Sequence, residues 1–317
     1  MFSFLSALLT ICPPHYPLPM PEPALSAPPH PLGQLDLLDL YELCVQSPAE
    51  LVSMLESIHG GAKDRAPREL GEDFCGSGAT SLAWLKAGLP TSPRRTAVAC
   101  DLDPAAIARL RRAAKALPGA ANASAFSKTA SLKCFARDVV TGKPPLDSKT
   151  AAADIVFVGN FSIGYIHTRS TLVKYFKRSR SRLKRGGVVI VDTYGGATSH
   201  TTGSLKRKFK LPDGRTVHYT WQQRTANPIT AMVENALHFR VEYKGEIIQD
   251  IADGFVYHWR LWTVPELHDA MTEAGLRRIE VFDQVPQAKD GNNQFVMQPV
   301  DGTEMDDSFA VLVSGRK

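Results

Sequence analysis

The feature that most constrains the fold is an alternation of apolar strand segments and helical segments between residues 70 and 192. Strands are expected to end near Phe74 and to cover 97–101, 133–137, 154–159 and 188–192, with helices at 79–89, 104–117 and 168–184. Continuously apolar strands separated by helices are typical of parallel sheets that are covered on both faces. The sequence therefore predicts an α/β core.

The segments on either side complete this core. Helical spacing over residues 35–58 is broken at Ser47 and Pro48, which predicts two short helices. Near the other end, Thr263 and Glu266 form a capping box that opens a helix, and Gly275 ends it. Strands at 278–282 and 309–314 follow. We expect a doubly wound, mostly parallel, seven-stranded Rossmann-like sheet.

Between these parts the periodicity changes to two. Residues 217–224, 236–243 and 255–262 alternate, with Asp213-Gly214 and Lys244-Gly245 as turn signals. This pattern predicts an antiparallel β insert. The expected organisation is an N-terminal helical segment at 35–66, a cofactor-binding α/β core at 67–200, the insert at 201–262 as a substrate lid, and 263–317 completing the core sheet.

Residues 1–34 are expected to form a disordered leader. Nine prolines between residues 13 and 31 remove backbone donors and favour extended, solvated chain. The apolar stretch before them, 1–12, is shorter than the roughly 20 residues that span a bilayer, so we expect no membrane association, with a targeting segment as the alternative.

Cysteine usage and net charge indicate the redox compartment and the possible partners of the protein. The cysteines form neither a C-x-x-C pair nor a metal-ligand spacing with histidine, and they stand at positions 12, 44, 75, 100 and 134. Scattered thiols with apolar neighbours indicate reduced side chains and a cytoplasmic location. The net charge of +5 permits an anionic partner without requiring one. The oligomeric state is not encoded in any recognisable pattern.

Two strand ends suggest a nucleoside-containing cofactor. Ligands of open parallel sheets bind outside the carboxyl ends of the strands, where the strand order reverses. The first such end, 72–78, carries Gly76 and Gly78, and the second, 101–104, carries a carboxylate at Asp101 that can accept both hydroxyls of a ribose. A dinucleotide fingerprint requires a glycine where Ser81 stands. Glu72 favours a cofactor with a cationic amino-acid tail over a diphosphate.

In this order, the 72–78 turn, the 101–104 strand end, Asp138, residues 154–160 and residues 183–187 resemble the motifs of class I S-adenosylmethionine-dependent methyltransferases. The resemblance covers about residues 70–314. More narrowly, Asp39-Leu40-Tyr41-Glu42, Glu72-Asp73-Phe74-Cys75-Gly76 and Tyr257-His258-Trp259-Arg260-Leu261-Trp262 are similar to an uncharacterised subgroup of that family. The resemblance implies S-adenosyl-L-methionine as the cofactor and methyl transfer as the activity.

The resemblance also implies roles for single residues. Glu72 would lie beside the methionine end, Gly76 and Gly78 would admit the cofactor, Asp101 would hold the ribose, Asp138 would lie near the adenine amine, and Asn160 and Phe161 would line the pocket. Phe74, Cys75 and Leu102 belong to the same two strand ends and complete the expected cofactor site. Phe74 departs from the family, which usually has its first glycine at that position.

Methyl transfer from a sulfonium is an in-line displacement that mainly requires alignment and exclusion of water. No metal or nucleophilic triad is expected, and a general base is optional. The candidates for contacting the acceptor are Tyr165, Tyr194, His258 and Arg260. The alternative to a catalytic role for His258 is a structural one. The alternative to substrate contact for Arg260 is an internal salt bridge.

Three functions remain open from the sequence. The leading one is methylation of a small molecule beneath the insert. The second is methylation of RNA or protein, using basic residues of the 168–184 helix such as Arg178 and Arg182, although Val173, Phe176 and Leu183 can equally form a buried stripe below a solvated face. The third is a noncatalytic binding protein, for which Phe74 is the best argument.

Overall fold

The computed structural model describes residues 32–60, 66–87, 95–117, 130–141, 152–285, 288–291, 294–303 and 305–317. The leader expected at 1–34 lies outside the described residues up to position 31. None of the described helices is both long and apolar enough to cross a membrane.

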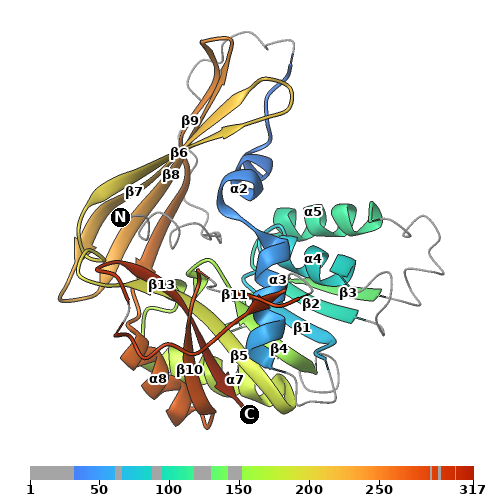
Figure 1. Ribbon diagram of the computed structural model, residues 1–317, viewed down its shortest axis with the longest axis vertical. Coiled ribbons are helices and arrows are strands. Elements are labelled where there is room, and N and C mark those ends of the chain that lie inside the picture. The colour runs from blue at the N-terminus through green and yellow to red at the C-terminus, as the bar shows by residue number, and fades with distance from the viewer. Residues whose placement is uncertain are drawn as a thin grey trace.

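A seven-stranded sheet forms the centre of the molecule (Figure 1). Its order is β10-β13-β5-β4-β1-β2-β3, and its strands are β1 (Glu69–Asp73), β2 (Arg95–Asp101), β3 (Ala130–Ala136), β4 (Ala153–Val158), β5 (Leu183–Gly195), β10 (Arg277–Asp283) and β13 (Phe309–Arg316). β13 runs antiparallel to both of its neighbours, and the other pairings are parallel. The α/β, mostly parallel, seven-stranded sheet predicted from the sequence is confirmed.

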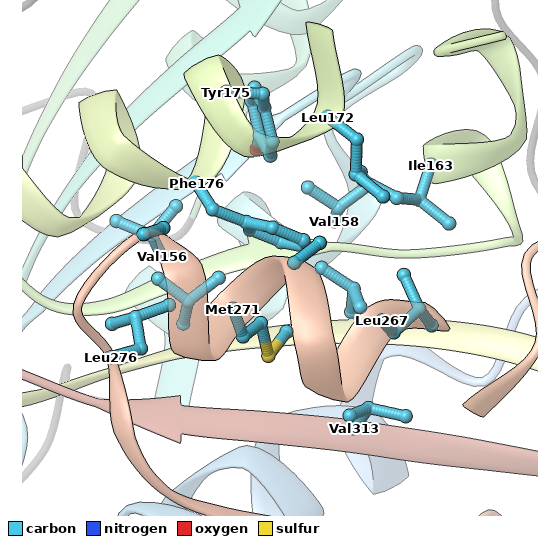
Figure 2. Packing of buried hydrophobic residues seen from close by; sticks show 14 of the residues in the cluster. Val156, Val158, Ile163, Leu172, Tyr175, Phe176, Leu267, Met271, Leu276 and Val313 are labelled. Atoms are coloured by element: carbon cyan, nitrogen blue, oxygen red, sulfur yellow. The ribbon is translucent and has the colours of Figure 1, made fainter. Parts of the chain in front are cut away.

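Helices cover both faces of this sheet. α3 (Pro48–His59), α4 (Ala79–Ala87) and α5 (Pro104–Lys115) lie on one face, and α7 (Arg169–Arg182) and α8 (Val264–Glu273) lie on the other (Figure 1). β4 shows why both layers are needed, because all six of its residues are buried. Its Ile155 and Phe157 pack towards α3 and α4, whereas Val156 and Val158 pack towards α7 and α8 (Figure 2).

The antiparallel insert is a separate four-stranded sheet between β5 and α8. It consists of β6 (Gly203–Lys210), β7 (Thr216–Asn227), β8 (Met232–Tyr243) and β9 (Glu246–Arg260), paired in that order. The three strands expected from alternation are present and longer than expected. β6 was missed because Lys206, Arg207 and Lys208 interrupt the apolar pattern that marks a strand. The edge strand keeps only half-buried residues on its inner side.

Helix α2 (Leu37–Val45) connects the insert to the core (Figure 1). Its buried Leu40 and Tyr41 pack into the aromatic inner face of the insert, where the Tyr41 ring meets Phe255 edge-on at 5.2 Å between ring centroids. Its acidic side pairs with Arg109 of α5 through Asp36, Asp39 and Glu42. The Asp39–Glu42 segment, which the sequence singles out, therefore joins two layers of the molecule.

A buried ion pair fastens α7 to the sheet. The guanidinium of Arg182 donates to both carboxylate oxygens of Asp73 at 3.0 and 2.8 Å, and the Tyr175 hydroxyl donates to the same carboxylate at 2.8 Å. Arg182 is 5% exposed and Asp73 is fully buried. Gly71 makes room for this pair, because a Cβ at that position would lie 2.7 Å from the Arg182 guanidinium.

Shorter elements complete the described chain. A 3₁₀ turn, η1 (Ser162–Tyr165), follows β4, and β11 (Ala288–Lys289) pairs with β12 (Phe295–Val296). The capping box expected at Thr263 is present at the start of α8. Cys44, Cys75 and Cys100 are buried free thiols, and Cys134 is a half-buried one. Cys12 lies outside the described residues.

Candidate cofactor site

The turn after β1 has the backbone conformation of a glycine-rich loop. Phe74, Gly76 and Gly78 have φ values of 56°, 52° and 71°. At Gly78 a Cβ would lie 2.5 Å from the side chain of Leu110 in α5, so no larger residue fits there without displacing that side chain. A left-handed conformation costs a non-glycine residue roughly 1–2 kcal/mol. Phe74 therefore keeps the shape of the turn at an energetic cost that the usual glycine avoids.

The carboxylate of Asp101 holds this turn from the end of β2. Its Oδ2 accepts the Gly76 N–H at 2.6 Å, and its Oδ1 accepts the Asp103 N–H at 2.9 Å. Asp101 is 1% exposed, yet it forms part of the wall of a cavity. The sequence reasoning anticipated Asp101 as a ligand-binding residue but not as a support for the glycine turn.

Glu72 lies deeper than the sequence reasoning expected. Its carboxylate accepts the backbone N–H of Ser81 at 2.9 Å and the Ser81 hydroxyl at 2.5 Å, at the start of α4. Burial raises the pKa of Glu72 to about 7, against the lowering effect of these hydrogen bonds. Glu72 is not among the residues that line the cavity. The geometry thus gives Glu72 a place beneath the turn, at the N-terminus of α4.

A cavity of about 220 Å³ opens at the carboxyl ends of β1, β2 and β3. Of the residues expected at the site, Phe74, Asp101, Leu102, Asp138 and Tyr165 line it together. Leu102 is 44% exposed, so its apolar side chain is accessible at the wall of the cavity. Asp138 accepts the Val140 N–H at 2.7 Å.

Other lining residues were missed by the sequence reasoning. They come from the segments that follow β3 and η1, and they are Arg137, Val139, Val140, Thr141, Ile166, His167, Thr168 and Thr171. Among them, His167 has its Nε2 at 2.9 Å from the carbonyl oxygen of His258 in the insert. Only their position in the sequence could have indicated that they line the cavity, because each segment follows the carboxyl end of a core strand.

Phe74 and Tyr165 form an aromatic wall of the cavity. Their rings are nearly parallel, with centroids 6.4 Å apart and an interplanar angle of 17°. Tyr165 then meets Trp259 of the insert edge-on at 6.0 Å. The residue that departs from the family pattern thus contributes its side chain to the cavity as well as a strained backbone.

The turn after β4 is held by a second buried carboxylate, from the neighbouring strand β5. Asn160 and Phe161 have φ values of 62° and 61°, although neither is glycine. Asp192 of β5 accepts the Asn160 N–H at 2.5 Å and the Phe161 N–H at 2.6 Å. Burial raises the pKa of Asp192 to about 7, while these two hydrogen bonds lower it. Asn160 and Phe161, both expected in the cofactor pocket, lie outside the residues that line the 220 Å³ cavity.

A second cavity of about 540 Å³ lies between the end of β5, the start of β13 and the insert. Tyr194, Trp221 and Phe309 give it aromatic walls, and Asp306 and Asp307 stand among its lining residues. Its remaining lining is rich in hydroxyl groups, from Thr198, Ser199, Thr201, Thr202, Ser204 and Ser308. Packed aromatic rings lie between the two cavities, since Tyr194 lies 4.9 Å from Phe161, which meets Trp259 at 6.3 Å between centroids.

The candidates for acceptor chemistry occupy different environments. The Tyr194 hydroxyl donates to Gln223 at 2.9 Å and accepts from Asn235 at 3.3 Å, and burial raises its pKa above the ordinary value of a tyrosine. His258 has a side chain that is 49% exposed and lies 3.6 Å from Glu234. Arg260 pairs with Glu266 at 2.8 Å and stacks on the Trp262 ring at 3.9 Å. The contacts of Arg260 are those of an internal salt bridge. The contact of His258 with Glu234 is compatible with a structural role for this histidine.

The basic helix is less available to an anionic partner than its sequence suggested. Val173, Phe176 and Leu183 are buried as expected. The expectation that Arg182 lies on the solvated face is wrong, because Arg182 is buried against Asp73, where an anionic partner cannot reach it. Within the described part of the chain, no group of three or more histidine, cysteine and acidic side chains could hold a metal ion.

The fold of this chain is similar to the folds of solved methyltransferase structures. Over 94% of this chain, the fold is similar to the sugar N-methyltransferase KedS8 of a Streptoalloteichus species, at 18% identity, 98% coverage of that chain and a TM-score of 0.59. It is also similar to DesVI of Streptomyces venezuelae, with 17% identity, 89% and 98% coverage of the two chains, and a TM-score of 0.57.

A third similar structure contains the cofactor. The amino pentose methyltransferase CalS10 of Micromonospora echinaspora, with S-adenosylmethionine bound, matches over 90% of this chain and 98% of its own at 15% identity and a TM-score of 0.57. No protein-family model matches the sequence, and no curated protein does. At these identities the likeness establishes the fold of the chain.

Proposed function

We propose that this chain is an S-adenosylmethionine-dependent methyltransferase that acts on a small molecule. The observation that carries the proposal is the cavity at the ends of β1, β2 and β3, where Asp101, Leu102 and Asp138 lie together beside the glycine turn. The fold alone would not suffice, because one fold hosts many functions. Here the fold and the residues at its strand ends point to the same cofactor.

The lining residues fit the parts of the cofactor. The Asp101 carboxylate would accept the ribose hydroxyls, the exposed Leu102 side chain would pack on the adenine ring, and Asp138 would accept from the adenine amine. Phe74 and Tyr165 would cover the opposite side and exclude water. When bound, the cofactor supplies a methyl group on a positively charged sulfur, so the chain itself has to align the acceptor and needs no nucleophile of its own.

The second cavity is the proposed acceptor site, with the insert as its cover. It contacts the end of β5 through Tyr194 and reaches the insert through Trp221. Aromatic walls with many hydroxyl groups and two carboxylates suit a hydroxylated ring that carries an amine. KedS8 is a sugar N-methyltransferase and CalS10 an amino pentose methyltransferase, which supports the same class of acceptor.

The cofactor site can be tested by calorimetry with S-adenosylmethionine and its demethylated product. Replacing Leu102→Ala should weaken binding about tenfold, because a large apolar contact with the adenine is lost. Leu43→Ala is the matched control, since Leu43 is 38% exposed and lies in α2, outside the cavity. If the two variants bind the cofactor with equal affinity, the cofactor does not bind beside Leu102. If the wild-type protein does not bind S-adenosylmethionine, the proposed function is refuted.

The acceptor site can be tested with amino sugars as probes and mass spectrometry as the readout. Ser204→Phe fills the second cavity from β6. It should abolish methylation and change affinity for the demethylated cofactor by no more than about twofold. Methylation that survives this substitution would place the acceptor elsewhere. A wild-type protein that binds cofactor and methylates no amino sugar would reject this acceptor class, and the noncatalytic alternative would then gain support.

A further inference from the structure

The turn that follows β4 has an unusual backbone for its residues. Asn160 and Phe161 are consecutive, both have φ near 60°, and both are nearly buried, at 5% and 3% exposure. Side chains with a Cβ avoid this left-handed region, and two such residues in succession require support from their surroundings. The chain offers no glycine at either position, so the support has to come from another element.

Asp192 provides that support from the neighbouring strand. Each of its two carboxylate oxygens accepts one of the two successive backbone N–H groups, at 2.5 and 2.6 Å. The amide of Gln284 makes a third and longer contact at 3.3 Å. Asp192 is 1% exposed, so water does not compete for these bonds. When the Asp192 carboxylate is ionised, these hydrogen bonds are charge-assisted and stronger than neutral ones.

The supported turn determines the path of the chain into the cofactor cavity. The carbonyl of Phe161 accepts the Gly164 N–H at 2.9 Å within η1. After η1 the chain continues through Ile166, His167 and Thr168. These residues and Tyr165 line the cavity, whereas Asp192 and Asn160 do not. The carboxylate of β5 thus acts on the cavity wall through the turn that it holds.

We propose that Asp192 is a positioning residue, which fixes the Asn160–Phe161 turn and thereby the Tyr165–Thr168 wall of the cofactor cavity. The effect on cofactor affinity rests on the proposed function, whereas the effect on the turn does not. The arrangement parallels that of Asp101, which accepts the Gly76 N–H from the end of β2. Each side of the cofactor cavity would then be held by one buried carboxylate of the core sheet.

A buried carboxylate at the opposite end of the sheet supplies a control. Asp154, at the start of β4, accepts the successive N–H groups of Arg68 and Glu69 with a single oxygen, Oδ2, at 2.7 and 3.0 Å, and its Oδ1 lies 3.2 Å from the Lys184 ammonium. It contacts neither cavity. Asp154→Asn and Asp192→Asn make the same chemical change, in which an amide replaces a carboxylate that accepts two backbone donors. Only the second change is made beside the cofactor turn.

Two measurements on both variants test the proposal. Hydrogen exchange of the cofactor-free protein should be at least about tenfold faster over residues 159–168 in Asp192→Asn, and Asp154→Asn should leave this segment unchanged. Affinity for the demethylated cofactor should fall at least about tenfold in Asp192→Asn and no more than about twofold in Asp154→Asn. Melting temperatures show whether the two substitutions destabilise the protein to a comparable extent.

The outcomes separate the two proposals. If wild-type protein binds no cofactor but exchange accelerates over 159–168, the proposed function fails and the positioning of the turn stands. Unchanged exchange in Asp192→Asn overturns the positioning role. Faster exchange with unchanged affinity overturns the link to the cavity wall. If Asp154→Asn loses as much cofactor affinity as Asp192→Asn, general destabilisation explains the loss in both variants. This result would also overturn the link between Asp192 and the cavity wall.

Discussion

At the scale of single residues, the site combines positions that the sequence identifies with one that departs from its pattern. Asp101, Leu102 and Asp138 could be predicted because each follows a recognisable strand end, and all three line the cavity. Phe74 stands where a glycine is usual and keeps a positive φ of 56°. The backbone of this turn is thus set by its neighbours, against the preference of the residue itself.

Comparing Phe74→Gly with Phe74→Ala isolates this backbone cost. Both substitutions remove the ring, but only glycine adopts the left-handed conformation freely. We expect the glycine variant to be more stable by about 1 kcal/mol, the reverse of the usual order for the two residues. Urea denaturation of both proteins measures the difference. An alanine variant as stable as the glycine variant would mean that the turn relaxes out of the left-handed region.

At the scale of elements, helix α7 shows what a charge pattern cannot reveal. The sequence places Arg182 in a run of basic residues, and the buried stripe of Val173, Phe176 and Leu183 was correctly anticipated. Which arginine faces inwards depends on its partner, Asp73, which lies 109 residues earlier in the chain. Long-range pairing of this kind has no local signal.

Removing the buried cation should destabilise the protein strongly. Arg182→Ala would leave the Asp73 carboxylate buried without its ion-pair partner, for an expected loss of about 3–5 kcal/mol. Arg180→Ala is the matched control, because Arg180 lies on the same last turn and is exposed, and its effect should stay within about 0.5 kcal/mol. Chemical denaturation of both variants distinguishes them. Similar losses would show that the ion pair contributes no special stability.

At the scale of the whole molecule, two buried acids below the strand ends influence how stability depends on pH. Burial raises the pKa of both Glu72 and Asp192 to about 7. Because these values exceed those of the unfolded chain, the folded state retains protons that the unfolded state releases between about pH 4 and pH 7. The contribution of each group to the free energy of unfolding is therefore largest at low pH and decreases as the pH rises through 7.

Glu72→Gln makes this contribution measurable. Between about pH 5 and pH 8, wild-type protein should lose on the order of 2 kcal/mol relative to the variant, since the glutamine cannot ionise. The contributions of the other titrating groups to the free energy of unfolding are the same in both proteins and cancel in this comparison. Glu50→Gln, on the exposed side of α3, is the control and should follow the wild-type curve. Parallel curves for wild type and Glu72→Gln would show that Glu72 keeps an ordinary pKa in the folded protein.

The sequence by itself determined the sheet and its strand ends, because these depend on local periodicity, helix caps and turn residues. It also located part of one cavity, since the carboxyl ends of parallel strands meet at the same edge of a sheet. Only the tertiary structure decided the inward turn of Glu72, the burial of Arg182 and the support that Asp192 gives to the turn after β4. Each of these depends on a partner from another element, and the chain contains no local pattern that names that partner.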